Sequence, residues 1–299
     1  MTLNPSGVLE FAFLYKRFNL RIFRMRYKMA TILDTILADK RQEVAGRKAE
    51  MPLEVLREKA KALPKCRNFY QAVTKKNPRG LNVIAEVKKA SPSAGLIRAD
   101  FDAVKIARIY EACGADAISV LTDEKYFQGR LEYLTAVKEA VRLPVLRKDF
   151  VVDPYQVYEA RAAGADAILL IAEAMRPSEL MDLLILANEL TLTTLIEVHD
   201  ADSLLQVRSL TGFPQQHYSV LGINNRDLRT MQVDLNTTGR LAELVDNRST
   251  LIAESGVRTR ADVEKLIGLG IGGVLIGQTL CASPDIAAKF AELFGPGAK

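Results

Sequence analysis

The hydrophobic positions of the chain change near residue 80 from a helical spacing to repeated short apolar runs. Between residues 32 and 63, apolar side chains recur every three or four positions, and Pro52 begins a second run of this kind. Because this spacing puts apolar side chains on one side of a helix, it predicts two amphipathic helices. The segment 66–76 predicts a third, shorter helix with its aromatic side chains on one side.

Eight short runs of aliphatic and β-branched residues follow, with the composition of buried strands. They begin at residues 82, 116, 144, 166, 193, 219, 250 and 272, and amphipathic helical patterns separate nearly all of them. GADAISVL from 114 and GADAILLI from 164 repeat one junction between helix and strand. Such strands indicate a parallel sheet buried on both faces. Without a G-x-G-x-x-G motif after the first strand, the pattern favours an α/β fold, a closed (β/α)8 TIM barrel with extra N-terminal helices at about 31–76.

Charge separates the first 28 residues from the rest of the chain. Six of the 41 Lys and Arg residues and one of the 36 Asp and Glu residues lie there, so residues 29–299 carry 35 of each sign. A neutral body argues against nucleic-acid binding. No apolar run reaches the roughly 20 residues of a membrane-spanning helix. We therefore predict a basic leader at 1–28, followed by a single barrel domain at 29–299 that binds no membrane.

Three readings of the leader stay open. It is a dispensable tail or start-site artefact before Met29, a targeting or membrane-surface segment, or a lineage-specific arm. The first is preferred, which predicts a cytoplasmic protein and makes organelle targeting the less favoured alternative. Cys66, Cys113 and Cys281 lie far apart without a CxxC or Cys/His pairing, so we predict no zinc site and no disulfide.

Polar and charged side chains stand at the carboxyl ends of the predicted strands, where barrels place their chemistry. They are Glu86, Lys88, Lys148, Asp149, Glu197, Asn224, Arg226, Glu254 and Ser255. Because side chains alternate along a strand, Glu86 and Lys88 share one face. Burying so many charges is costly unless they pair or meet a charged ligand. A ring of internal ion pairs and an anion-binding site are therefore alternatives.

Glycines follow the last two strands, Gly256 after Ser255 and Gly277 before Gln278. Such loops let backbone N–H groups approach a phosphate closely. The two histidines stand apart from this pattern, since His217 lies in a helix-to-strand connection and we expect His199 on the outer face of its strand. Proton transfer therefore falls to Lys and Glu, with the pKa of a Lys lowered by nearby cations and that of a Glu raised in a dry site.

Seven segments that follow one another along the predicted barrel have the form of sequence motifs. They are IAEVKKASPSAG from 84, SVLTDEKYFQG from 119, LPVLRKDFVVDPYQVYEAR from 143, LIEVHD from 195, GINNRDL from 222, IAESGV from 252 and LIGQTL from 275. With ILDTILADKRQEVAGRK from 32, they resemble the indole-3-glycerol phosphate synthase family from about Met29 onward. The resemblance implies closure of the indole ring of 1-(2-carboxyphenylamino)-1-deoxyribulose 5-phosphate, with loss of CO2 and water, in tryptophan biosynthesis. It implies no metal and no cofactor.

The resemblance also implies residue roles. Lys148 would be the general acid at the substrate carbonyl, and Glu197 the base. Lys88 and Glu86 would serve the dehydration step, with the division of acid and base between them open. Asn224 and Arg226 would hold Glu86 and the substrate hydroxyls. The phosphate would lie near Glu254, Ser255, Gly256, Gly277 and Gln278. The aromatic ring would lie in an apolar slot formed by Pro92, Phe127, Phe150, Leu169, Leu228 and Leu275, and Ser91 and Ser93 would be polar substrate contacts or closing groups.

Two other functions are compatible with a barrel of this kind. A phosphoribosylanthranilate isomerase-like barrel would carry a Cys at the end of the first strand, where this chain has Glu86. A catalytically inactive barrel scaffold would not need the full set of acids, bases and anion-binding groups. We therefore expect one small anionic substrate, carrying phosphate and carboxylate, as the partner of a monomer or weak oligomer. We also expect the segment 91–95 to be a mobile loop.

Overall fold

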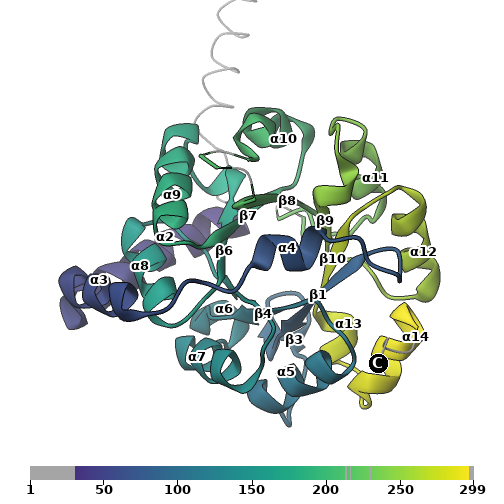
Figure 1. Cartoon of the computed structure of the whole chain (residues 1–299), viewed down its shortest axis with the longest axis horizontal. Helices are drawn as coiled ribbons and strands as arrows, with labels where there is room; N and C mark the ends of the chain where they lie inside the picture. The colour runs from purple at the N-terminus through teal and green to yellow at the C-terminus, as the bar shows by residue number, and fades with distance from the viewer. Residues whose placement is uncertain (1–30, 213, 216, 229, 296–299) are drawn as a thin grey trace, which may run out of the picture.

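The computed structural model describes residues 31–212, 214–215, 217–228 and 230–295. Eight parallel strands close into a barrel in the order β1-β10-β9-β8-β7-β6-β5-β4 (Figure 1). Their bounds are β1 Asn82–Val87, β4 Ala117–Leu121, β5 Val145–Lys148, β6 Ala167–Ile171, β7 Thr193–Val198, β8 Ser219–Asn224, β9 Leu251–Glu254 and β10 Gly273–Ile276. Each predicted apolar run contains one of these strands, so the predicted (β/α)8 barrel is confirmed.

Helices surround the strands on the outside of the barrel (Figure 1). They are α5 Ala103–Ala112, α6 Glu124–Phe127, α7 Leu131–Ala140, α8 Pro154–Ala162, α9 Pro177–Glu189, α10 Ala201–Val207, α11 Asn236–Ala242, α12 Arg260–Gly268, α13 Gln278–Cys281 and α14 Ile286–Phe294, with short 3-10 turns η1 Ala172–Ala174, η2 Arg208–Leu210 and η3 Arg248–Thr250. Among the described residues, none of the helices has the length and apolar character needed to cross a membrane.

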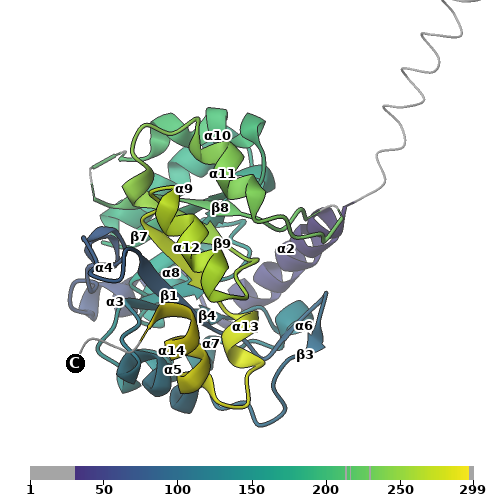
Figure 2. The same cartoon turned by 90° about the vertical axis from the view of Figure 1, so that its right-hand side faces the viewer.

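The three predicted N-terminal helices are α2 Ile32–Glu50, α3 Leu53–Ala62 and α4 Phe69–Thr74. A capping box between Thr31 and Asp34 begins α2. Helix α4 buries Phe69 and Val73 against the interior residues of the barrel. Figure 2 shows α4 and α2 at opposite ends of the barrel, with α2 on the side of α6 and α13. The basic leader at 1–28 lies outside the described residues, and the division into leader and single domain stays a prediction.

The segment after β1 differs from the irregular loop that was expected. β2 Ala90–Ser91 and β3 Gly95–Leu96 pair as a short antiparallel hairpin, with Pro92 and Ser93 in its turn. Gly95 has a φ of +64°, a left-handed conformation that glycine adopts readily. The expected mobility of this segment stays a prediction.

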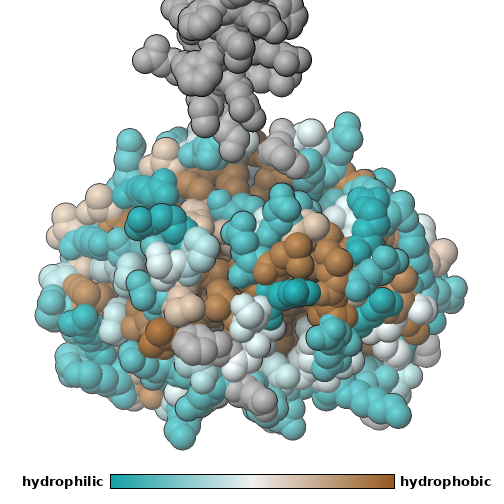
Figure 3. Space-filling view, turned by 90° about the horizontal axis from the view of Figure 1, so that it is seen from above, coloured by the Kyte–Doolittle hydropathy of each residue, from teal (hydrophilic) through white to brown (hydrophobic). Residues whose placement is uncertain are grey.

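Apolar side chains fill two layers. The larger cluster packs the outward side chains of the strands against the helices, and a second cluster fills the barrel interior. The large hydrophobic side chains exposed among the described residues are Val55, Leu96, Met181, Leu205 and Leu244. On the face drawn in Figure 3, apolar areas lie between hydrophilic side chains.

Candidate active site

Charged side chains form the next interior layer above the apolar core of the barrel. Ile84, Leu146, Leu195 and Ile252 belong to the interior apolar cluster. Two positions further along the same four strands stand Glu86, Lys148, Glu197 and Glu254. Because strand side chains alternate, these four also point inward, at the carboxyl end of the barrel. All three carboxyl groups are nearly fully buried.

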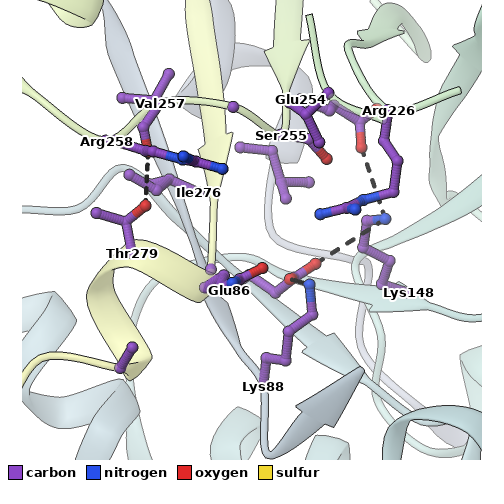
Figure 4. A pocket seen from close by; sticks show the side chains of 16 residues that line it. Glu86, Lys88, Lys148, Arg226, Glu254, Ser255, Val257, Arg258, Ile276 and Thr279 are labelled. Atoms are coloured by element: carbon purple, nitrogen blue, oxygen red, sulfur yellow. Dashed lines mark hydrogen bonds and ion pairs between the residues drawn. The ribbon is translucent and has the colours of Figure 1, made fainter. Parts of the chain in front are cut away.

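Lys148 lies within 4 Å of the other three residues of this layer, and Figure 4 shows it between Glu86 and Glu254. Its Nζ is 3.6 Å from Glu197 Oε2, 3.7 Å from Glu254 Oε2 and 3.9 Å from Glu86 Oε2. The other oxygen of Glu86 lies 2.5 Å from Lys88 Nζ. The structure thus brings together four predicted catalytic residues and Glu254, which was predicted at the phosphate end but directs its carboxyl group to Lys148.

The expected lowering of a lysine pKa is wrong for Lys148. Burial disfavours its ammonium, but the three surrounding carboxyl groups outweigh burial and raise the pKa of Lys148 above its ordinary value. The prediction failed because it counted the neighbouring cations and not the carboxylates that face this side chain. Lys148 is therefore charged at neutral pH and can donate a proton.

The carboxyl groups of Glu197 and Glu254 differ in protonation. Burial alone would raise both pKa values. For Glu197, Lys148 and His199 outweigh burial and lower the pKa below its ordinary value. For Glu254, burial and the nearby charge of Glu197 raise the pKa well above its ordinary value. The raised carboxyl pKa expected from the sequence thus belongs to Glu254 and not to the predicted base Glu197.

His199 lies beside the site and not on the outer face of its strand, as the sequence analysis had expected. Its Nε2 is 3.2 Å from Glu197 Oε1, and its Nδ1 is 3.1 Å from Glu173 Oε2. Burial opposes the charged ring, but the two carboxylates raise the pKa of His199 to about 10. The alternation that places Glu86 with Lys88 also places Glu197 with His199, and this signal was overlooked.

Two glycines make room for the buried carboxyl groups. A Cβ on Gly222 would collide with Oε1 of Glu254, and a Cβ on Gly277 would collide with Oε1 of Glu86. In the sheet, Gly222 is the register partner of Glu197 on the adjacent strand. The absence of a side chain at Gly222 therefore lets Glu254 lean across β8 toward Glu197.

A polar cavity of about 340 Å³ opens beside Lys148 (Figure 4). Glu86, Lys88, Arg226, Ser255, Gly256, Leu275, Gly277 and Gln278 line it, together with Arg258 and Thr279. Ser255 and Gly256 have φ values of +64° and +93°, so the chain turns sharply at the cavity wall. Arg226 and Arg258 form no ion pair within the part of the chain that the structure describes. The cavity thus offers uncompensated positive charge to an anion.

A second, smaller and more apolar cavity of about 80 Å³ adjoins the first. It is lined by the predicted ring contacts Pro92, Phe127, Phe150, Leu169 and Leu228, by the predicted polar contacts Ser91 and Ser93, and by Asn224. Leu275, which was predicted with them, lines the first cavity instead. Lys88, Lys148, Arg226 and Ser255 line both cavities.

Sequence reasoning missed several residues of these walls. Ile32, Leu33 and Ile36 of α2 line the apolar cavity, and Arg258 lines the polar one. The helical spacing gave the apolar face of α2 but not what that face packs against. Arg258 lies two residues after Gly256, and this closeness to a predicted phosphate loop was an available signal.

The chain on either side of Lys148 is held by buried ion pairs. Arg147 Nη2 lies 3.1 Å from Asp149 Oδ2, and Lys40 Nζ lies 2.9 Å from Asp149 Oδ1. Burial opposes the charge of Asp149, but Arg147 and Lys40 lower the pKa of its carboxyl group below the ordinary range. This network ties α2 to the end of β5.

Comparison with known proteins decides the family. The family model described as indole-3-glycerol phosphate synthase matches residues 33–293. The chain belongs to the indole-3-glycerol phosphate synthase family. A family member from Rhodopirellula baltica is 49% identical over 256 residues, covering 86% of this chain and 96% of the relative. One from Neisseria gonorrhoeae is 48% identical over 267 residues, covering 89% of this chain and 100% of the relative.

Solved structures of other proteins share the fold. A 3-hexulose-6-phosphate synthase matches with a TM-score of 0.56 at 17% identity, covering 73% of this chain and 100% of that one. A thiamine phosphate pyrophosphorylase from Pyrococcus furiosus matches with a TM-score of 0.51 at 16% identity, covering 73% and 96%. At these identities the likeness shows the barrel alone. The family assignment disfavours both the phosphoribosylanthranilate isomerase reading and the inactive scaffold.

Proposed function

We propose that Lys148 is the general acid of the indole-3-glycerol phosphate synthase reaction in this chain. The observation that carries the proposal is the ring of Glu86, Glu197 and Glu254 around the ammonium of Lys148, between a polar and an apolar cavity. The reaction closes the indole ring of 1-(2-carboxyphenylamino)-1-deoxyribulose 5-phosphate with loss of CO2 and water.

The two cavities fit the two ends of this substrate. The phosphate would lie in the polar cavity, on the backbone of Ser255, Gly256, Gly277 and Gln278, with Arg226 and Arg258 supplying positive charge. The aromatic ring would lie in the apolar cavity near Pro92, Phe127 and Phe150. The carbonyl group stands between phosphate and ring in the substrate. It would therefore meet the residues common to both cavities, of which Lys148 is one.

Ring closure needs a proton at that carbonyl. As the ring carbon attacks, the Lys148 ammonium donates a proton to the oxygen, and the neighbouring carboxylate of Glu197 stabilises the cation that forms on the ring. Loss of CO2 from this cation leaves a neutral five-membered ring that carries the new hydroxyl. The site holds the departing carboxylate in surroundings drier than water, which favours its loss.

Loss of water completes the indole. The Glu86 carboxylate and Lys88 ammonium, 2.5 Å apart, form a proton-transfer pair on the opposite side of the site from Glu197. One member gives a proton to the leaving hydroxyl and the other removes a proton from the ring. Asn224 and Arg226, which line the apolar cavity with Lys88, would hold the substrate hydroxyls.

The test is conversion of the substrate by purified protein, followed by indole fluorescence. We expect wild type to form indole-3-glycerol phosphate and Lys148→Ala to lose at least about 100-fold in kcat, because a positioned general acid contributes that much. Lys61→Ala is the control, since this lysine is 71% exposed and pairs with its helix neighbour Glu58. An inactive wild type, or an undiminished Lys148→Ala, contradicts the proposal.

We further propose that the enzyme works in the cytoplasm, on a single small substrate that carries phosphate and carboxylate. In an otherwise evenly charged body, the polar cavity is lined by Lys88, Lys148, Arg226 and Arg258 against only two carboxyl groups, and this excess supports such a substrate. A monomeric or weakly oligomeric state stays a prediction.

A further inference from the structure

His199 and Glu173 form a polar pair that the proposed mechanism does not use. One oxygen of Glu173 accepts the backbone N–H of His199 at 2.8 Å, and the other lies 3.1 Å from its Nδ1. Glu173 thus holds both the backbone and the ring of His199, and Nε2 of the ring lies 3.2 Å from Glu197 Oε1. The other oxygen of Glu197 faces Lys148. The carboxylate of the proposed base is thus clamped between two cations.

Carboxyl groups outnumber cations around Lys148. Three of them lie within 4 Å of its ammonium, and Lys88 pairs with Glu86. Lys148 is therefore the remaining cation for both Glu197 and Glu254. Because Gly222 lets Glu254 lean toward Glu197, the two compete for that cation, and neighbouring carboxylates in a dry site tend to retain a proton between them.

His199 favours Glu197 over Glu254 as the ionised carboxyl group. Glu197 is faced by Lys148 from β5, Glu254 from β9 and His199 at the end of its own strand. His199 is in turn faced by Glu173 from η1 and by Glu197. The charged groups that act on Glu254 are Glu197, Lys148 and Glu86. Lys148 is the one cation among these three, whereas Glu197 faces both Lys148 and His199. The histidine therefore adds positive charge to one member of the carboxyl pair.

We propose that His199, oriented by Glu173, is a positioning residue that keeps the Glu197 carboxylate ionised and leaves the proton of the pair on Glu254. This inference rests on the proposed function, because it concerns the base of that reaction. A protonated Glu197 could neither stabilise the cationic intermediate nor accept a proton. His199 acts through Glu197 and transfers no proton itself. The pair Glu173–His199 thus extends the working pH range of the site toward acid.

The first experiment measures the charge of His199 without using catalysis. The chain has two histidines, so proton NMR of the imidazole C2–H groups gives two signals, and His217→Gln assigns them. We expect the His199 signal of the wild type to stay that of an imidazolium well above the ordinary pKa of 6.5. In Glu173→Gln it should titrate at lower pH. Titration of wild-type His199 near its ordinary pKa would overturn the inference.

The second experiment measures kcat against pH for wild type, His199→Gln and His199→Asn. Both variants keep a neutral hydrogen-bonding group, so both should move the acid limb of the profile upward by about one pH unit. Glu173→Gln should move it in the same direction by less. A uniform loss of kcat without a shifted limb would show a merely structural role and overturn the inference. If wild type lacks activity, the proposed function fails, and the NMR result alone decides for or against the charge on His199.

Discussion

Lys40 Nζ lies 2.9 Å from Asp149 Oδ1, although Lys40 belongs to helix α2 and Asp149 directly follows the proposed acid Lys148. The same ammonium lies 2.8 Å from Asp123 Oδ2, and its side chain is 1% exposed. The N-terminal helix α2 therefore joins the barrel through a buried cation that pairs with one carboxylate after β4 and one after β5. The position of Lys148 and the stability of the chain around it therefore depend in part on Lys40, which lies outside the (β/α)8 unit.

Replacing Lys40 by Met should strongly destabilise the protein. The change leaves Asp123 and Asp149 buried without their shared cation, which costs about 3–5 kcal/mol in the free energy of unfolding. Lys48→Met on the same helix is the control, because its pair with Asp153 is exposed and contributes less than about 1 kcal/mol. Urea unfolding measures both. Equal losses in the two variants would contradict the larger contribution of the buried pairs.

Adding a methyl group at Gly277 should impair catalysis more than folding. A Cβ there meets the carboxyl group of Glu86, which must move and take its pair with Lys88 along. Displacement of a reacting group by about 1 Å can cost about 100-fold in rate, so we expect a loss in kcat of that order for Gly277→Ala. Gly268→Ala is the matched control, since nothing lies within 4 Å of its added Cβ. Similar kcat values in the two variants would contradict the close approach.

Stability should depend on pH through His199. Its pKa in the folded protein is about 10, above the ordinary value of 6.5. A raised folded-state pKa stabilises the protein fully below the unfolded value, and this contribution is lost as pH rises through the folded value. The free energy by which wild type exceeds His199→Gln should therefore shrink between about pH 6.5 and about pH 10. Urea unfolding at several pH values measures it; a constant or growing difference would refute the charged histidine.

Removal of residues 1–28 should leave turnover nearly unchanged. Among the described residues, those that line the two cavities run from Ile32 to Ala282, and every proposed catalytic residue lies within this range. The measurement compares kcat and KM of the full chain with those of a chain that begins at Met29. A large loss in either constant would assign the leader a part in catalysis.

The strands and most of the site could be predicted because both follow local rules. Apolar runs gave the strands, and alternation placed Glu86, Lys148 and Glu197 inside the barrel mouth. The direction of the Lys148 pKa could not be predicted in this way. It depends on how closely the carboxyl groups of Glu197, Glu254 and Glu86 approach Lys148, and these are contacts between residues on different strands.

Long-range pairs account for the other gaps. Glu173 and His199 come from different strand ends, and no spacing in the sequence joins them. The contact of α2 with the apolar cavity likewise depends on how a helix packs across the barrel. A periodic pattern predicts the apolar face of an element and not its neighbour.

The central claim is that the Lys148 ammonium supplies the proton for ring closure. The most direct measurement is the separation of kcat from KM for Lys148→Gln, whose side chain can hydrogen-bond to the surrounding carboxyl groups but cannot act as an acid. With substrate at saturation, we predict a fall in kcat of at least about 100-fold and a smaller change in KM. A kcat equal to that of the wild type, or a loss confined to KM, would contradict the account.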